Sequence, residues 1–119
     1  MASFSYSLAQ DVVTAQFKKS VVSANYKGVS ELCSEFVEIE TDKYEETTSK
    51  NQVSFILKDF FTKHPPKKFT YNHIGTSPGG AKYAIAFYES LDGMTFLVVV
   101  KFKVDKGNLL IDTIKFTPE

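Results

Sequence analysis

The sequence predicts an α+β protein in which helices pack on a curved antiparallel sheet. An amphipathic segment over residues 49–63 is stopped by His64-Pro65-Pro66, and strand-like segments separated by glycine turns follow as far as residue 117. Short turns between consecutive strands make neighbouring strands antiparallel. A chain of 119 residues is long enough for one domain with its own core.

The N-terminal part is expected to combine a tail with a helix. We expect residues 1–9 to form a tail and residues 10–119 to form a single domain. Apolar residues recur at helical spacing over residues 8–26, which predicts a helix with one buried stripe. The stripe comprises Val12, Val13, Phe17, Val21 and Val22. Gly28 is expected to end this helix, and a short helical turn over residues 29–34 to follow it.

The middle of the chain contains a short strand, a polar loop and the most clearly marked helix. Glutamates alternate with Val37 and Ile39 over residues 36–41, which is typical of a half-exposed strand. Residues 42–48 are polar throughout and predict a solvated loop. Ser49 and Gln52 form a capping box at the start of the helix. The apolar face of that helix comprises Val53, Ile56, Leu57, Phe60 and Phe61.

Four strands are predicted after the two prolines, over residues 69–76, 81–89, 94–104 and 109–117. Alternation along the third of them places apolar side chains uniformly on the inner face, which faces the helices. On the last strand, the same period directs Leu110, Asp112, Ile114 and Phe116 inward and Ile111 outward. The complete predicted order is α-α-β-α-β-β-β-β.

Composition and charge exclude several classes of function. The 14 basic residues balance 14 acidic ones, so no basic face for a nucleic-acid partner is expected. No apolar stretch approaches the roughly twenty residues of a transmembrane segment. The single cysteine, Cys33, excludes an internal disulfide and a cysteine-based metal site. Since the two histidines lie far apart in sequence, we expect no metal site, and no motif indicates a cofactor.

Motifs in the C-terminal two-thirds of the chain resemble a family of small, mostly exported Bacteroidetes proteins of unknown function. The motifs are Ser49-Lys50-Asn51-Gln52, residues 56–61, Pro65-Pro66, residues 69–75 with Ser77, and residues 80–85. The resemblance implies a nuclear-transport-factor-2-like (cystatin-like) fold, a cone in which a bent sheet wraps around helices. Proteins of that fold include ketosteroid isomerase, dehydratases and non-enzymatic binding modules. The family supplies no catalytic residues to assign to this chain.

The N-terminal residues leave two interpretations open. Ser7-Leu8-Ala9 has the small-x-small form of a signal-peptidase site, but residues 1–6 supply neither a charged region nor an apolar one before it. The segment is therefore either the remnant of an export signal or a frayed tail. Residues 8–11 also resemble the junction where signal peptides of the family end. This resemblance favours an exported or periplasmic native protein, whose mature N-terminus the sequence does not fix.

Two residues are candidates for acid–base chemistry. Asp112 is expected on the apolar inner face, where burial would raise the pKa of its carboxyl group. His73 is expected on one strand face with Tyr71 and Gly75, where an imidazole beside a phenol could transfer protons near neutral pH. A structural role is the alternative for each. His64 is expected to interact with the carbonyl groups at the end of its helix.

The leading functional hypothesis is a non-enzymatic module that binds a small apolar ligand or a protein partner. With 11 Phe and 6 Tyr residues, the chain can build an aromatic pocket between the helices and the inner face. The residues expected to line this pocket are Tyr71, Tyr83, Phe87 and Phe60. One alternative is an isomerase- or dehydratase-like enzyme that uses Asp112 or His73. Another is an architectural homodimer formed through an outer apolar face of Leu97, Val99 and Ile111.

Overall fold

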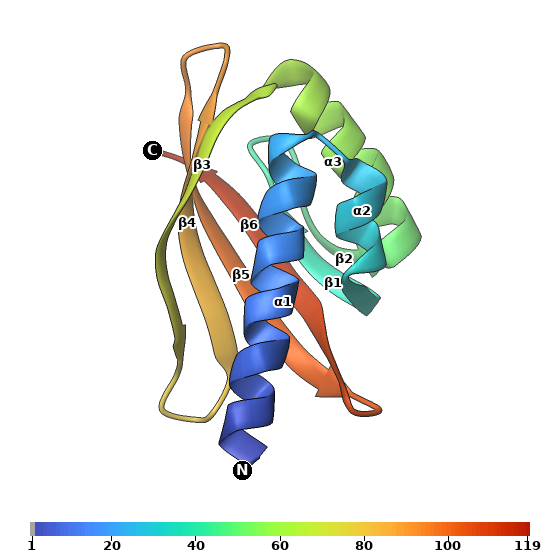
Figure 1. Ribbon diagram of the computed structural model, residues 1–119. Coiled ribbons are helices and arrows are strands. Elements are labelled where there is room, and N and C mark those ends of the chain that lie inside the picture. Colours follow the sequence, from blue (N-terminus) through green and yellow to red (C-terminus); the bar gives the residue numbers. More distant parts are fainter. Residues whose placement is uncertain (1) are drawn as a thin grey trace.

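Helices cover one face of a strongly curved sheet in the computed structural model, which describes the backbone of residues 2–119 and the side chains of residues 8–119 (Figure 1). The helices within this range are α1 (Ala2–Val22), α2 (Tyr26–Glu31) and α3 (Lys50–Lys63). The strands are β1 (Cys33–Glu40), β2 (Glu45–Ser49), β3 (Pro66–Thr76), β4 (Lys82–Ser90), β5 (Thr95–Asp105) and β6 (Asn108–Pro118). The sheet order is β2-β1-β6-β5-β4-β3, and only the β1–β6 pair is parallel. The predicted α+β class is confirmed.

Helix α1 begins at Ala2, before the predicted start at residue 8, and ends at Val22. Phe17 and Val21 are buried in the core, but Val12 and Val22 are 55% and 45% exposed, so the predicted stripe is wrong at these two positions. Adjacent helical residues point about 100° apart, and the buried side of α1 includes Val21 but not its neighbour Val22.

The connection from α1 to α2 also differs from the prediction. Ala24 adopts a left-handed conformation with φ of 53°, which ends the first helix well before Gly28. The side chain of Asn25 then caps α2 by accepting a hydrogen bond from the backbone N–H of Gly28 at 3.0 Å. Gly28 therefore lies inside α2.

Part of the predicted polar loop is a strand. Residues Glu45–Ser49 form β2, which pairs antiparallel with β1 and places Glu46 opposite Ile39. Strand β2 lies at an edge of the sheet, and its side chains are largely exposed. Backbone hydrogen bonds to β1 hold this edge strand, so its sequence needs no apolar alternation.

Helix α3 agrees closely with the prediction. The Ser49 hydroxyl accepts a hydrogen bond from the N–H of Gln52 at 3.3 Å, and all five residues of the predicted apolar face are buried. The helix ends at Lys63, directly before His64-Pro65-Pro66. The local residues thus decide both ends of this element.

The four strands β3 to β6 form the predicted antiparallel meander, but β6 carries a bulge. Lys101 pairs with Thr113, and the next residue, Phe102, pairs with Ile111. Asp112 is the extra residue between these pairs. One extra residue inverts the alternation, so Ile111 is fully buried and Leu110 is only partly buried. The predicted inward placement of Leu110 and Asp112 and the outward placement of Ile111 are therefore wrong.

The curved sheet gives the molecule two different ends (Figure 1). At one, which we call the closed end, the end of α3 lies beside the β1–β2 and β4–β5 turns. At the other, the open end, the start of α1 lies beside the β3–β4 and β5–β6 turns. An aromatic cluster fills the core toward the closed end. It comprises Phe60, Phe61, Tyr88, Phe96 and Phe116.

Candidate functional site

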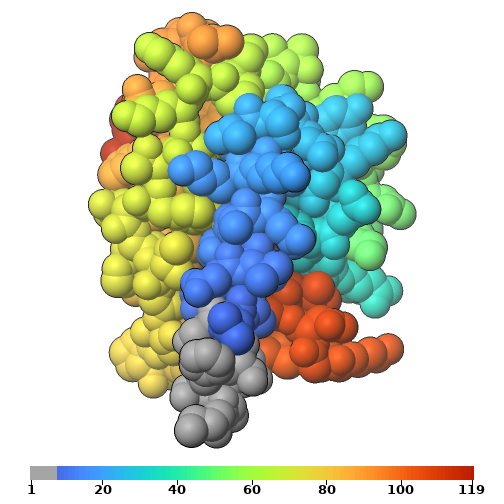
Figure 2. Space-filling model, viewed as in Figure 1, coloured from blue at the N-terminus to red at the C-terminus, as the bar shows by residue number. Residues whose placement is uncertain are grey.

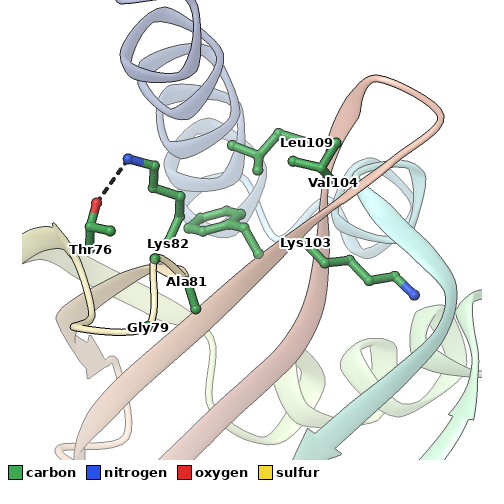
Figure 3. Close-up of a pocket in the computed structure, with 9 residues that line it drawn as sticks. Thr76, Gly79, Ala81, Lys82, Lys103, Val104 and Leu109 are labelled. Atoms are coloured by element: carbon green, nitrogen blue, oxygen red, sulfur yellow. Dashed lines mark hydrogen bonds between the residues drawn. The ribbon is translucent and has the colours of Figure 1, made fainter. Parts of the chain in front are cut away.

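A cavity of about 610 Å³ lies at the open end, on the face of the sheet that carries α1 (Figure 3). Strands β3 to β6 contribute to its wall. Thr76 of β3 pairs with Lys82 of β4, and Lys82 lies on the same strand face as the buried residue Ala84. On the neighbouring strands Phe102 and Leu109 are buried, whereas Val104 is 46% exposed. The described lining residues are Thr76, Gly79, Gly80, Ala81, Lys82, Phe102, Lys103, Val104 and Leu109.

The cavity has a polar side and an apolar side. The ammonium group of Lys82 donates a hydrogen bond to the Thr76 hydroxyl at 2.8 Å. In Figure 3, these two side chains lie together on one side, and Val104 and Leu109 lie together on the other. The Lys103 side chain extends away from Lys82 and Thr76. This arrangement can accommodate a molecule with one polar end and one apolar end.

Helix α1 is fixed over this region by two side chains. The buried amide of Gln10 donates to the carbonyl groups of Gly75 at 3.3 Å and of Tyr83 at 3.4 Å. Farther along the helix, the Tyr71 hydroxyl donates to the carbonyl group of Thr14 at 2.6 Å. Burial raises the pKa of Tyr71 above its ordinary value, so the phenol stays protonated as a donor.

A second groove, of about 430 Å³, runs along the other side of α1. Its wall is largely apolar and includes Leu8 and Val12 of α1, Leu32 after α2, and Leu109 and Leu110 of β6. Figure 2 shows α1 crossing this face, with the β3–β4 segment on one side and the β5–β6 hairpin on the other. Leu109 lines both this groove and the cavity at the open end.

The four residues predicted to line an aromatic pocket do not come together. Phe60 is 2% exposed and packed inside the aromatic cluster. Tyr71 faces α1, whereas Tyr83 and Phe87 lie on the opposite, outer face of β4, since the buried residues of that strand are the alternate ones. None of these four residues is among the described residues that line the cavity at the open end.

His73 and Asp112 also lie away from the cavity. A register shift between Tyr71 and His73 turns the histidine to the outer face, so these two residues do not share a face as predicted. His73 is exposed there, and its Nε2 lies 3.0 Å from the Tyr83 hydroxyl. A Cβ at Gly75 would come within 2.7 Å of that nitrogen, so glycine leaves room for this contact. The Asp112 carboxylate accepts a hydrogen bond from Thr113 at 3.1 Å.

The outer face of the sheet contains a small apolar patch with a composition other than predicted. Leu97 and Val99 are partly exposed and pair across strands with Phe87 and Ile85, respectively. Ile111 is fully buried on the inner face and does not belong to this patch. We call the group of Ile85, Phe87, Leu97 and Val99 the outer patch.

An unexpected ionic cluster joins three segments at the closed end. His64 is 8% exposed, with Nδ1 2.7 Å from a carboxylate oxygen of Asp92 and Nε2 2.9 Å from one of Asp42. Its ring packs against Phe60 and Phe96 at centroid distances of 5.2 and 5.0 Å. The sequence prediction that the side chain serves the carbonyl groups of its own helix was wrong. Asp42 is exposed between β1 and β2, as predicted, but its carboxylate also reaches the His64 ring.

The ionic cluster favours a charged imidazole. Burial of the ring opposes protonation, but hydrogen bonds and charges from Asp42 and Asp92 outweigh it and raise the pKa of His64. Hydrogen bonding from Ser90 and the interaction with His64 lower the pKa of Asp92 despite its partial desolvation. The Tyr88 hydroxyl donates to the backbone carbonyl of His64, so the same histidine is held at three points. The partners lie 22 and 28 residues from His64 in sequence, and no local pattern connects them.

Other chemical groups offer little for a reaction. Cys33 is buried, and this burial raises the pKa of its thiol to about 12. Among the side chains of residues 8–119, no group of three or more His, Cys, Asp or Glu residues is placed to hold a metal ion. Within the described chain, no helix is long and apolar enough to cross a membrane.

Comparisons with known proteins identify the family. The family model described as "Domain of unknown function (DUF4783)" matches residues 13–117. A DUF4783 protein from Bacteroides ovatus is similar in structure, with a TM-score of 0.79 at 19% identity over 88% of this chain and 94% of that one. One from Bacteroides uniformis has a TM-score of 0.80 at 15% identity, covering 88% and 95% of the two chains.

The same fold extends beyond these bacteria. A nuclear-transport-factor-2-like protein of unknown function from Shewanella baltica has a TM-score of 0.70 at 12% identity, over 98% of this chain and 95% of that one. No curated protein matches the sequence. Since the family model spans most of the chain and the solved structures share its architecture, the protein belongs to the DUF4783 family of unknown function and has a nuclear-transport-factor-2-like fold.

Proposed function

We propose that the protein is a non-enzymatic module that binds a small apolar or amphipathic molecule in the cavity at the open end. The observation that carries the proposal is the cavity itself, whose volume of about 610 Å³ falls within the usual range for ligand sites. Phe102, Leu109 and Val104 give it an apolar wall, and the Lys82–Thr76 pair gives it a polar point. Sites of this composition hold a ligand by burying its apolar surface, and a small number of polar groups fix the ligand's orientation.

A fluorescent apolar probe tests this proposal. N-phenyl-1-naphthylamine should bind the purified protein with a saturable increase in fluorescence. Ala81→Trp should abolish this binding, because Ala81 lines the cavity and a large ring there would fill it. Asn51→Trp adds the same ring at an exposed position on α3 and serves as the control. No saturable binding by the wild type, or equal binding by both tryptophan variants, would contradict the proposal.

A second candidate function is self-association through the outer patch. Ile85 pairs with Val99 and Phe87 pairs with Leu97, so four partly exposed apolar side chains are contiguous on an uncovered sheet face. Contiguous apolar surface of this kind is typical of an interface. Sedimentation velocity should detect a dimer that Val99→Lys disrupts and Thr95→Lys, on the same strand face but outside the outer patch, preserves. A monomeric wild type at high concentration would reject this function.

The isomerase- or dehydratase-like alternative has less support. It requires an open cavity that reaches Asp112 or His73 together with a second polar group. Neither residue lines the cavity at the open end, and the His73–Tyr83 pair is on the outer face.

Export of the native protein is proposed on the family resemblance alone. Fractionation of cells that carry the complete natural gene, followed by sequencing of the mature N-terminus, tests it. Recovery in the cytoplasm with an uncleaved N-terminus would reject it.

A further inference from the structure

Lys82 is a charged residue on the inner face of the sheet. Residues Ala84, Ala86 and Tyr88 of the same strand are buried, and Lys82 continues their alternation at the start of β4. Its cross-strand partner is Thr76, whose hydroxyl accepts a hydrogen bond from the ammonium group. A lysine at such a position brings a positive charge to the polar side of the cavity.

The charge of the cavity is one-sided. Among its described lining residues, two are lysines and none is acidic. Only one lysine counts as a ligand-binding group, since Lys103 extends away from the Lys82–Thr76 pair in Figure 3. A single ammonium group beside a hydroxyl suits a monovalent anion such as a carboxylate, which accepts hydrogen bonds from both.

The remaining wall sets the other half of the ligand. Phe102 and Leu109 are only 5% and 8% exposed, and together with Val104 they continue the cavity away from the polar pair. These side chains offer apolar contact without hydrogen-bonding atoms. An aliphatic chain would bury its surface there, at a gain of about 0.8 kcal/mol for each buried CH₂ group.

We infer that the cavity takes a carboxylate-headed amphiphile, such as a medium-chain fatty acid. The carboxylate lies at Lys82 and Thr76, and the aliphatic chain lies along Phe102 toward Val104 and Leu109. This inference rests on the proposed function and adds the chemical class of the ligand. Charge complementarity distinguishes this class from neutral and cationic amphiphiles of the same length.

Three ligands of equal chain length test the inference. Decanoate, 1-decanol and decyltrimethylammonium are used below their aggregation concentrations at pH 7.5 to displace N-phenyl-1-naphthylamine. Decanoate should displace the probe at a concentration about tenfold lower than 1-decanol, the ratio expected for one charge-assisted hydrogen bond. Decyltrimethylammonium should be the weakest of the three. Added salt should weaken only the decanoate competition.

Variants of Lys82 connect this preference to the site. Lys82→Met should bring the displacing concentrations of decanoate and 1-decanol to within about twofold of each other, while Lys82→Arg should keep the preference for decanoate. Thermal unfolding of each variant checks that it folds, and Lys82→Gln replaces the methionine variant if that one does not. Equal affinity of the wild type for decanoate and 1-decanol, or an unchanged preference in Lys82→Met, would overturn the inference and leave the proposed function intact. Failure of every ligand and of the probe to bind would overturn both.

Discussion

The closed end and the open end of the sheet share the same strands but are filled differently. At the closed end, Phe60 packs against Phe116, Phe96 and Tyr88 at centroid distances of 4.6, 5.0 and 5.6 Å. At the open end, Phe102 borders a cavity, and the adjacent apolar Val104 is 46% exposed. The aromatic cluster is thus packed where α3 meets the sheet.

The polar groups differ between the two ends as well. His64 and its two aspartates satisfy one another and join α3 to the β1–β2 and β4–β5 turns. At the open end, Lys82 and Thr76 are adjacent on paired strands and share a hydrogen bond beside the cavity. A saturated ionic cluster stabilises a fold, whereas a cation on the wall of a cavity can serve a ligand. We therefore expect substitutions at the closed end to act mainly on stability and substitutions at the open end to act on the proposed binding.

The largest effect is expected from a pair of matched truncations. Phe60→Ala should lower the free energy of unfolding by about 3–5 kcal/mol, because it removes a ring enclosed on all sides. Phe102→Ala should cost at least about 1 kcal/mol less, since its ring already borders open space. Urea unfolding of both variants and the wild type measures the difference. Equal losses would show that the two ends are packed equally well.

The second prediction concerns the pH dependence of stability. The raised pKa of His64 contributes stability that is complete below the unfolded value of 6.5 and is lost as the pH rises through the folded value. The free energy of unfolding should therefore decrease from pH 6 toward alkaline pH. His64→Gln should flatten this slope. The control is His73→Gln at an exposed position, which should keep it, and an equal slope in all three proteins would contradict the role of His64.

The third prediction separates the two aspartates of the ionic cluster. Asp92→Asn and Asp42→Asn should each lower the pKa of His64, because each removes a negative charge and a hydrogen-bond acceptor for the charged ring. Titration of the His64 ring protons by NMR measures this shift. Asp112→Asn, at the bulge of β6, should leave the titration unchanged. An unaltered midpoint in both ionic-cluster variants would mean that the carboxylates do not hold the ring.

The smallest effect on stability is expected at the rim of the cavity. Val104→Ser should change the free energy of unfolding by no more than about 0.5 kcal/mol, because the side chain is largely solvated already. The same change should weaken binding of N-phenyl-1-naphthylamine, since it makes the apolar wall polar. Thermal unfolding and probe titration measure the two effects on one preparation. A large loss of stability without a change in binding would reverse the roles of the two ends.

Elements with strong local determinants were predictable in detail. Ser49 caps α3, five apolar residues form its buried face, and two prolines follow its end, all within one short segment. Strand β2 was not predictable, because its polar residues pair with β1 only in the folded chain. The bulge at Asp112 was hidden for a different reason. Leu109, Leu110 and Ile111 are consecutive apolar residues, so the sequence fits either register before the bulge.

The candidate site was only partly predictable. The predicted pocket residues Tyr83 and Phe87 lie on the outer face of β4, and the bulge in β3 turns His73 outward. Neither the side of β4 that faces the helices nor the bulge could be read from the local sequence. Lys82 was visible in the sequence as part of a motif, yet nothing local indicated that it turns inward. The ionic cluster of His64 escaped prediction because its members come from three separate segments.

The sequence by itself determined helix α3, the four-strand meander that follows it and the turns between those strands. Capping residues, prolines and glycines with positive φ such as Gly93 and Gly107 act on their immediate neighbours, so their effects can be read locally. The tertiary structure alone decided which face each side chain of β6 occupies, which charges meet at His64 and where the core stops short of the open end. These outcomes depend on strand register and on contacts between residues distant in sequence, where one inserted residue exchanges the inside of the sheet for the outside.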